Sequence, residues 1–242
     1  MLRHIGIRRS FYHNLRLAIL LCLNAGFINA AGFLAFAVLT TNVTGHAALL
    51  AVNMVTGKQH SLLVVGLWLF LFLAGAFCSA SYIRKIGPNK PHAYTVPIAG
   101  IILVLLAVIF LSNDKDTLIK SEYFAGSLLF AMGMQNALVS MISGSVVRTT
   151  HLTGMFTDLS IDLSALIFQV DPTDAALKRR LLLRSSIILF FLAGGVLGGF
   201  CFIRYAYHAF IIPICLLILV LFGDYFRIHL HRLLKQRGKT LR

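Results

Sequence analysis

Charged residues are scarce in this sequence, and acidic residues are the rarest of them. Asp, Glu, Lys and Arg together make up 12% of the 242 residues, about half the share that is usual in soluble domains. Hydrophobic residues make up 58%, and the mean hydropathy is +0.85. A soluble globular domain is therefore excluded, and the composition indicates an all-α bundle that crosses a membrane several times.

Basic residues outnumber acidic ones, 22 against 8, which gives a formal net charge of +14. They cluster at the two termini and in short connectors that flank apolar runs. This distribution follows the positive-inside rule, so we expect both termini in the cytoplasm and a lipid bilayer, not nucleic acid, as the partner. Residues 223–242 are predicted to form a basic cytoplasmic tail.

Motifs of catalysis and cofactor binding are missing as well. We find no zinc-ligand spacing, no nucleophile elbow and no Gly-rich phosphate loop, so we expect no metal, no cofactor and no enzymatic activity. The cysteines lie inside apolar runs and lack Cys-x-x-Cys spacing, which predicts small buried hydrophobic side chains instead of disulfides. They are Cys22, Cys78, Cys201 and Cys215.

Long apolar runs are what the sequence has in abundance. The first, 15–39, follows a basic segment but is longer than the core of a signal peptide, so we expect an uncleaved transmembrane helix. Two segments, 45–56 and 154–170, are shorter. The other runs that we expect to cross the membrane are 61–83, 95–111, 122–147, 181–203 and 207–222.

Two polar motifs occur twice, in the same order. Residues 40–45, Thr-Thr-Asn-Val-Thr-Gly, return as residues 149–154, Thr-Thr-His-Leu-Thr-Gly. Upstream of them, Gly-Phe-Ile-Asn-Ala at 26–30 matches Gly-Met-Gln-Asn-Ala at 133–137. A double match in the same order indicates two related halves.

A third motif, Phe-Leu-Ala-Gly, occurs at 72–75 and again at 191–194. We therefore predict a single membrane domain with an internal two-fold repeat, repeat one at about 15–111 and repeat two at about 122–222. If the two short segments re-enter the membrane, the chain crosses six times and the halves are inverted. If they span it, there are eight crossings and parallel halves. Segment length favours six crossings, whereas the distribution of charge does not separate the two arrangements.

The Thr-Gly motifs are predicted to break the helix at membrane depth and to start a short helix. The first N–H groups of such a helix lack partners, and its dipole favours an anionic or polar group, so these residues are candidate solute ligands. A hydrogen-bonded kink is the alternative. The candidates are Asn42, Thr44 and Gly45 in the first half and His151, Thr153 and Gly154 in the second.

Polar side chains inside the apolar runs are further candidates, because each costs free energy in hydrocarbon unless it has a partner. Asn29 and Asn136 are either solute ligands or hydrogen bonds between helices. Asp158 and Asp162 share a helix face and could carry a proton or a cation, or could equally neutralise Arg148 or sit in the interface. Their counterparts in the first half are Leu49 and Asn53, and the unaligned His46 and His151 are only a weak metal signal.

These repeated motifs resemble those of the YoaK family, multi-pass proteins of the bacterial inner membrane with a domain of unknown function. The resemblance covers nearly the whole chain and implies that location and architecture. The sequence departs from the family pattern at Asn29, where the family usually has an acidic residue, and at residues 43–46, Val-Thr-Gly-His, where the family has Met-Thr-Gly-Asn.

The leading hypothesis is a transporter or channel for a small polar or anionic solute that binds near the two helix starts. Asn29 and Asn136 would be ligands, and Asp158 or Asp162 would be a coupling site. An intramembrane enzyme that uses His151 with Asp158 is one alternative, and a membrane scaffold or accessory subunit is another. A homo-oligomer is also compatible with the sequence.

Overall fold

The described part of the protein is helical throughout. A computed structural model describes residues 11–87, 90, 93–112, 118–168 and 174–222, and these contain helices and no strand. The predicted all-α class is confirmed. The helices are α1 (Phe11–Phe36), α2 (Val43–Val55), α3 (Gln59–Ile86), α4 (Thr95–Leu111), α5 (Leu118–Ser143), α6 (Leu152–Phe168), α7 (Ala175–Tyr205) and the 3₁₀ turn η3 (Ala206–Phe210).

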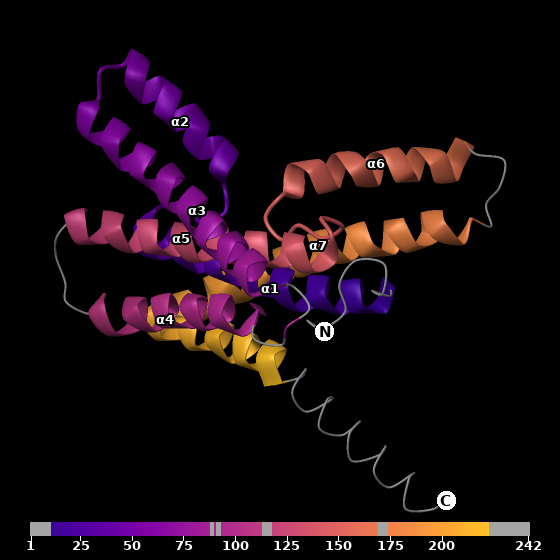
Figure 1. Cartoon of the computed structure of the whole chain (residues 1–242). Coiled ribbons are helices and arrows are strands. Elements are labelled where there is room, and N and C mark those ends of the chain that lie inside the picture. The colour runs from indigo at the N-terminus through magenta and orange to yellow at the C-terminus, as the bar shows by residue number, and fades with distance from the viewer. Residues whose placement is uncertain (1–10, 88–89, 91–92, 113–117, 169–173, 223–242) are drawn as a thin grey trace, which may run out of the picture.

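Four helical stretches are long and apolar enough to cross a membrane: α1, α3, the part of α5 from Ser121, and the stretch from Ala175 to Phe222. The last contains α7, η3 and a further helical segment, 211–222. The chain turns back at η3, so that this segment lies beneath α4 in Figure 1. Helix α2 has 13 residues and is therefore about 20 Å long, well short of the roughly 30 Å hydrocarbon core.

The close packing of α1 on α7 depends on glycine. A methyl group added at Gly26 would overlap the backbone carbonyl of Phe191, and one added at Gly194 would overlap that of Leu23. Small residues let two helix backbones approach in this way, which is how helices associate inside a bilayer.

The contact between α3 and α5 uses the same chemistry. A methyl group at Gly133 would overlap the carbonyl of Phe72, and one at Gly75 would overlap that of Phe130. The Gly-Phe-Ile-Asn-Ala motif of α1 thus packs on the Phe-Leu-Ala-Gly motif of α7. The Phe-Leu-Ala-Gly motif of α3 packs on the Gly-Met-Gln-Asn-Ala motif of α5. The two halves are therefore interleaved and do not fold as separate lobes (Figure 1).

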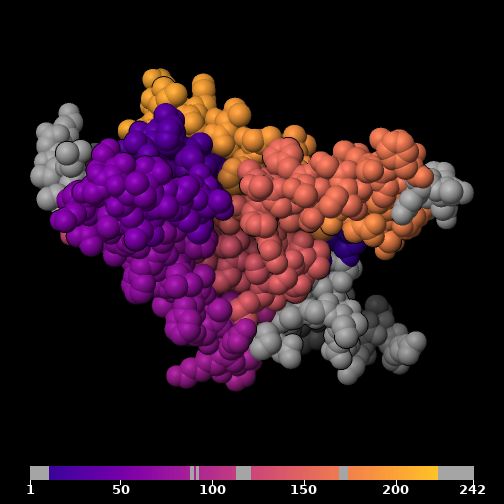
Figure 2. Space-filling model, turned by 90° about the horizontal axis from the view of Figure 1, so that it is seen from above, coloured from indigo at the N-terminus to yellow at the C-terminus, as the bar shows by residue number. Residues whose placement is uncertain are grey.

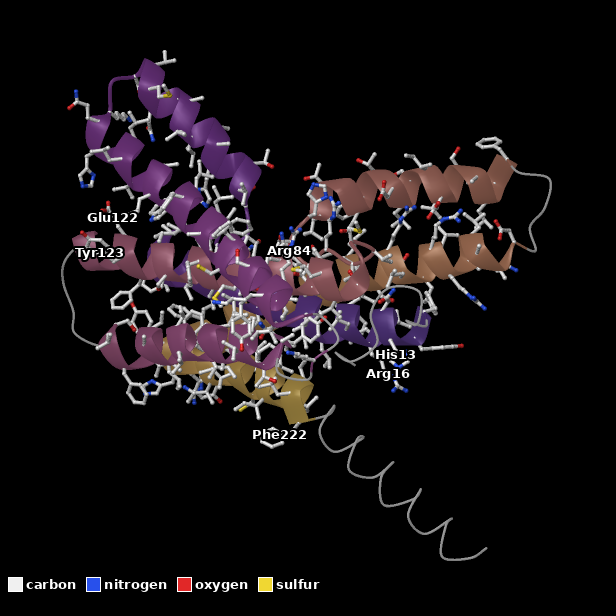
Figure 3. The ribbon with its side chains drawn as sticks, viewed as in Figure 1. His13, Arg16, Arg84, Glu122, Tyr123 and Phe222 are labelled. Carbon is white, nitrogen blue, oxygen red and sulfur yellow. The ribbon has the colours of Figure 1, made fainter. Side chains whose placement is uncertain are left out.

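Helices α1 and α5 cross each other in opposite directions. Asn24, near the middle of α1, bonds to Gln135, late in α5. Phe36, at the end of α1, stacks on Phe124, near the start of α5, with ring centroids 6.0 Å apart. Figure 3 labels His13 and Arg16 at the start of α1 and Glu122 and Tyr123 at the start of α5, at opposite ends of the bundle.

The two short helices form outlying arms. Helix α2 folds back on α3, and α6 folds back on α7, and they appear as separate lobes in Figure 2. The outer faces of the arms are apolar, and Val55 is 89% exposed in the isolated chain. Such a surface suits contact with lipid.

The positions of the cysteines correct one expectation from the sequence. Cys78 and Cys215 lie on the outer surface, whereas Cys22 is buried.

Candidate functional site

The first helix break turns the chain back along α1. Helix α1 ends at Phe36, and Ala37 has a φ of 56°. The backbone N–H of Thr41 then donates to the side-chain oxygen of Asn29, 3.1 Å away. Asn29 lies seven residues, about two turns, before the end of α1. The chain therefore returns about two turns along α1 before α2 starts, and Asn29 holds it in that position.

Asn42 caps α2. Its side-chain oxygen accepts a hydrogen bond from the N–H of Gly45 at 3.0 Å, and its backbone carbonyl accepts one from the backbone N–H of His46. Asn is among the best N-cap residues for this reason. The His46 ring donates through Nε2 to the carbonyl of Leu39, 2.9 Å away, and contacts Trp68 edge to face. The start of α2 is thus fastened to its own loop and to α3.

The second break reproduces this plan with different details. Helix α5 ends at Ser143, and Gly144 has a φ of 64°. Helix α6 starts at the residue after His151, as α2 starts after Asn42, and the carbonyl of His151 accepts from the N–H of Met155. The imidazole lies against Gly154, where an added methyl group would collide with the ring. A helix therefore begins at matching residues of the two motifs.

Two threonine hydroxyls are buried just before these helices. Thr40 and Thr149 are both 0% exposed, and neither hydroxyl oxygen has a hydrogen-bond partner among the described residues. The side-chain oxygen of Asn136 is unpaired there as well, whereas that of Asn29 accepts from Thr41. Buried polar groups nearly always have a partner, so these atoms could bind a polar group, although Asn24 Oδ1 and Ser79 Oγ, which lie elsewhere in the core, are unpaired among the described residues too.

The other candidate residues are more open. Asn42, Thr44, His151 and Thr153 are exposed in the isolated chain, and Gly45, Gly154, Asn29 and Asn136 are half-buried. Both helices start toward the middle of the molecule and run outward in opposite directions (Figure 1). Among the residues that the structure describes, no hydrogen bond joins the candidate residues of the first break to those of the second. Both starts lie toward the middle of the molecule, but no bond fastens one to the other.

Asp158 and Asp162 face α7. Asp162 is buried and pairs with Arg184, and with Arg180 at 3.3 Å. Arg184 also bonds to the carbonyl of Asp158 at 2.7 Å and lies 3.5 Å from its carboxylate. The partners are thus arginines of α7, and not Arg148, which sequence proximity suggested. An arginine at 184, inside an apolar run, is the signal that would have predicted them.

A buried amide pair joins α1 to α5. The Asn24 amide donates to the Gln135 carbonyl oxygen at 2.7 Å, and the Gln135 amide donates to the backbone carbonyl of Leu21 at 2.9 Å. Both side chains are 0% exposed. Both are polar residues within apolar runs of the sequence, which gives no sign that they meet. A pairing between residues 111 positions apart follows from packing alone.

No group of three or more potential metal-ligating His, Cys, Asp and Glu side chains occurs among the described residues. Asp158 contacts Arg184 and not His151, so the geometry lends no support to a catalytic pair of His151 with Asp158. What the site offers is two helix starts, hydroxyl groups and amides. These groups can bind a polar solute by hydrogen bonds.

Comparisons with curated proteins and with solved structures gave no match. A family model described as "Protein of unknown function (DUF1275)" matches residues 17–223, which covers every helix from α2 to η3 and most of α1. The family suggested by the repeated motifs and the one identified by this match agree. The chain therefore belongs to the DUF1275 family of proteins of unknown function.

Proposed function

We propose that the protein is a membrane transporter or channel that passes a small polar or anionic solute between the starts of α2 and α6. One observation carries this proposal: two short helices begin at matching residues toward the middle of the molecule and run outward on opposite sides of it (Figure 1). Short helices that start inside a membrane bundle are a recurring way of building a solute site.

The chemistry of the two starts favours a solute that is anionic or rich in hydrogen-bond acceptors. The first N–H groups of a helix carry partial positive charge. The hydroxyls of Thr44 and Thr153 are exposed in the first turn of α2 and α6. Those of Thr40 and Thr149 are buried in the segment just before each helix. Together they form a polar stretch in an otherwise apolar bundle.

The direction of the helices supports the inverted arrangement with six crossings. Because α1 and α5 are antiparallel, matching helices of the two halves would cross a bilayer in opposite directions. Eight crossings with parallel halves would require them to run the same way. With the basic termini inside, we place the protein in the bacterial inner membrane with both ends in the cytoplasm.

The test is solute flux into proteoliposomes. Vesicles that contain the protein are mixed with chloride, nitrate, formate, phosphate, glycerol or urea, and swelling is followed by light scattering. We expect flux of at least one anion or small polar solute, and its loss in the double variant Thr44→Val with Thr153→Val, because both first-turn hydroxyls are removed.

The matched control is Thr56→Val with Thr157→Val. These hydroxyls are also exposed, but each bonds to a carbonyl of its own helix, at 2.9 and 3.1 Å. The control should keep the flux of the unmodified protein. Unchanged flux in the Thr44 and Thr153 variant would refute the proposed role of the helix starts.

A further inference from the structure

The bundle contains two helix pairs whose backbones are interlocked. In the α1–α7 pair, Gly26 and Gly194 bring each backbone against a carbonyl of the other helix. In the α3–α5 pair, Gly133 and Gly75 do the same. Because backbone atoms cannot rotate away as side chains can, neither helix of a pair can slide past the other without breaking this contact. Each pair should move as one body.

The contact between the two pairs is of a different kind. Along α1 and α5 the helices meet through the Asn24–Gln135 amide bond and through side-chain ends, such as Leu128 approaching Gly32 and Phe36 stacked on Phe124. This contact and that of α4 with η3 are much less extensive than the contacts within the pairs, and the pairs also meet where segment 211–222, which continues from α7 and η3, lies beneath α4 (Figure 1). Side-chain ends can exchange rotamers, so this joint can flex where the glycine crossings cannot.

Each short helix is attached to both pairs. Helix α2 packs along α3, in one pair, while the residues just before it are held by Asn29 of α1, in the other. Helix α6 is held on α7 by Arg184 and Asp162, while the chain enters it from the end of α5. A relative rotation of the two pairs therefore shifts the start of each short helix relative to the rest of that helix.

We propose that the α1–α7 and α3–α5 pairs rock against each other about the Asn24–Gln135 contact, and that this motion opens the two helix starts to opposite sides of the membrane in turn. The inference rests on the proposed function, since it describes how the same site is reached. It assigns the moving bodies to pairs that mix the two sequence halves, not to the halves themselves. Two arrangements of packed helices are the usual basis of such switching.

The test measures access to the starts of α2 and α6 instead of flux. In a variant whose four cysteines are replaced by Ala, a single cysteine is introduced by Thr44→Cys or Thr153→Cys. Its reaction with a membrane-impermeant maleimide is timed in right-side-out and in inverted vesicles. We expect each cysteine to react from both sides.

A cleavable thiol cross-linker then locks one contact at a time. The lock between the pairs joins Phe36→Cys on α1 to Phe124→Cys on α5, at positions whose rings stack 6.0 Å apart. The lock within a pair joins Leu34→Cys on α1 to Gly199→Cys on α7, where the Leu34 side chain lies 3.8 Å from the site of an added Cβ. The cysteine at the helix start is protected during cross-linking. Its reaction with the maleimide is then timed before and after the lock is released.

The lock between the pairs should slow labelling from one side by about tenfold or more, and cleavage should restore it. The lock within the α1–α7 pair should leave both rates nearly unchanged. Equal effects of the two locks, or none, would overturn the rocking motion while leaving a channel intact. A helix start that reacts from neither side in the unlocked protein would overturn the proposed function itself, and the inference with it.

Discussion

The α2–α3 arm and the α6–α7 arm have the same backbone plan but are held by different chemistry. In each, a short helix starts at the residue after a Thr-Thr-x motif and folds back on the next long helix. In the first arm His46 is the one buried residue of α2, and it rests against Trp68. In the second arm the buried Asp162 is paired with Arg184.

The difference is concentrated at matching positions. Asn53 stands where the second arm has Asp162, and Val65, which is buried, stands where α7 has Arg184. An ion pair in a medium of low dielectric constant holds strongly while both partners are present and becomes a liability when one is removed. Apolar and aromatic contacts fail more gradually. We infer that α6 is fixed to α7 more firmly than α2 is fixed to α3.

The largest effect is expected from Arg184→Leu. The change leaves Asp162 buried with only the half-exposed Arg180 beside it, and should lower the free energy of unfolding by about 3–5 kcal/mol. The measurement is unfolding by SDS in mixed micelles. Adding Asp162→Leu to the same chain should recover much of the loss, because no buried charge then remains.

The control for this comparison is Arg179→Leu, an exposed arginine of the same helix, which should change stability by no more than about 0.5 kcal/mol. A loss at Arg184 no larger than that at Arg179 would contradict the view that the second arm is held by charge.

Gly26→Ala and Gly133→Ala are expected to cost similar amounts, about 1–3 kcal/mol each or somewhat more, because each added methyl group meets a backbone carbonyl of the facing helix. The readout is the same SDS titration. Gly66→Ala, on α3, is the control, since an added methyl group there meets only the Leu50 side chain at 3.7 Å. A large loss at one glycine and none at its counterpart would show that the two crossings are not equivalent.

Replacing the residue just before each short helix should affect α2 and α6 to different extents. Asn42→Ala deletes the bond to the N–H of Gly45 and should destabilise α2 by about 0.5–2 kcal/mol. Hydrogen exchange of the α2 amides measures this locally. His151→Ala, at the matching position, should loosen α6 less, because Asp162 and Arg184 still hold the helix. Equal loss of protection in α2 and α6 would argue against the difference between the arms.

The smallest effect is expected at Trp68→Phe. The indole N–H donates to the carbonyl of Glu122 at 3.0 Å, and the ring supports His46, so its loss should cost about 0.5–1.5 kcal/mol. Protection of α2 should fall while that of α6 stays constant. Phe70→Leu, at an exposed aromatic residue two positions further along α3, serves as the control and should affect neither arm.

Much of the helical framework could be predicted from the sequence. The apolar run 95–111 coincides with α4, and the expected restart near Thr44 lies one residue from the start of α2. These predictions succeed because an apolar run must satisfy its backbone within a helix in a bilayer, and because Asn and Thr compete with the helix for hydrogen bonds at a break.

The partners of the site residues could not be predicted in the same way. Asp162 pairs with Arg184 and not with Arg148, and Gln135 bonds to Asn24 rather than to an atom of its own helix. Long helices that are apolar on most sides carry no stripe that indicates which neighbour they face. Their pairing depends on where small residues allow two backbones to approach, which one sequence does not specify.

The sequence by itself determined that the chain forms apolar helices compatible with an integral membrane protein, with two matching breaks, since composition and hydrogen-bonding requirements decide those features locally. The tertiary structure decided that α1 packs on α7 and α3 on α5, so that the two halves interleave. It also decided that Asn29 holds the returning chain about two turns before the end of α1, just ahead of α2. Those contacts join residues far apart in the chain, and only the packing of helix backbones selects them.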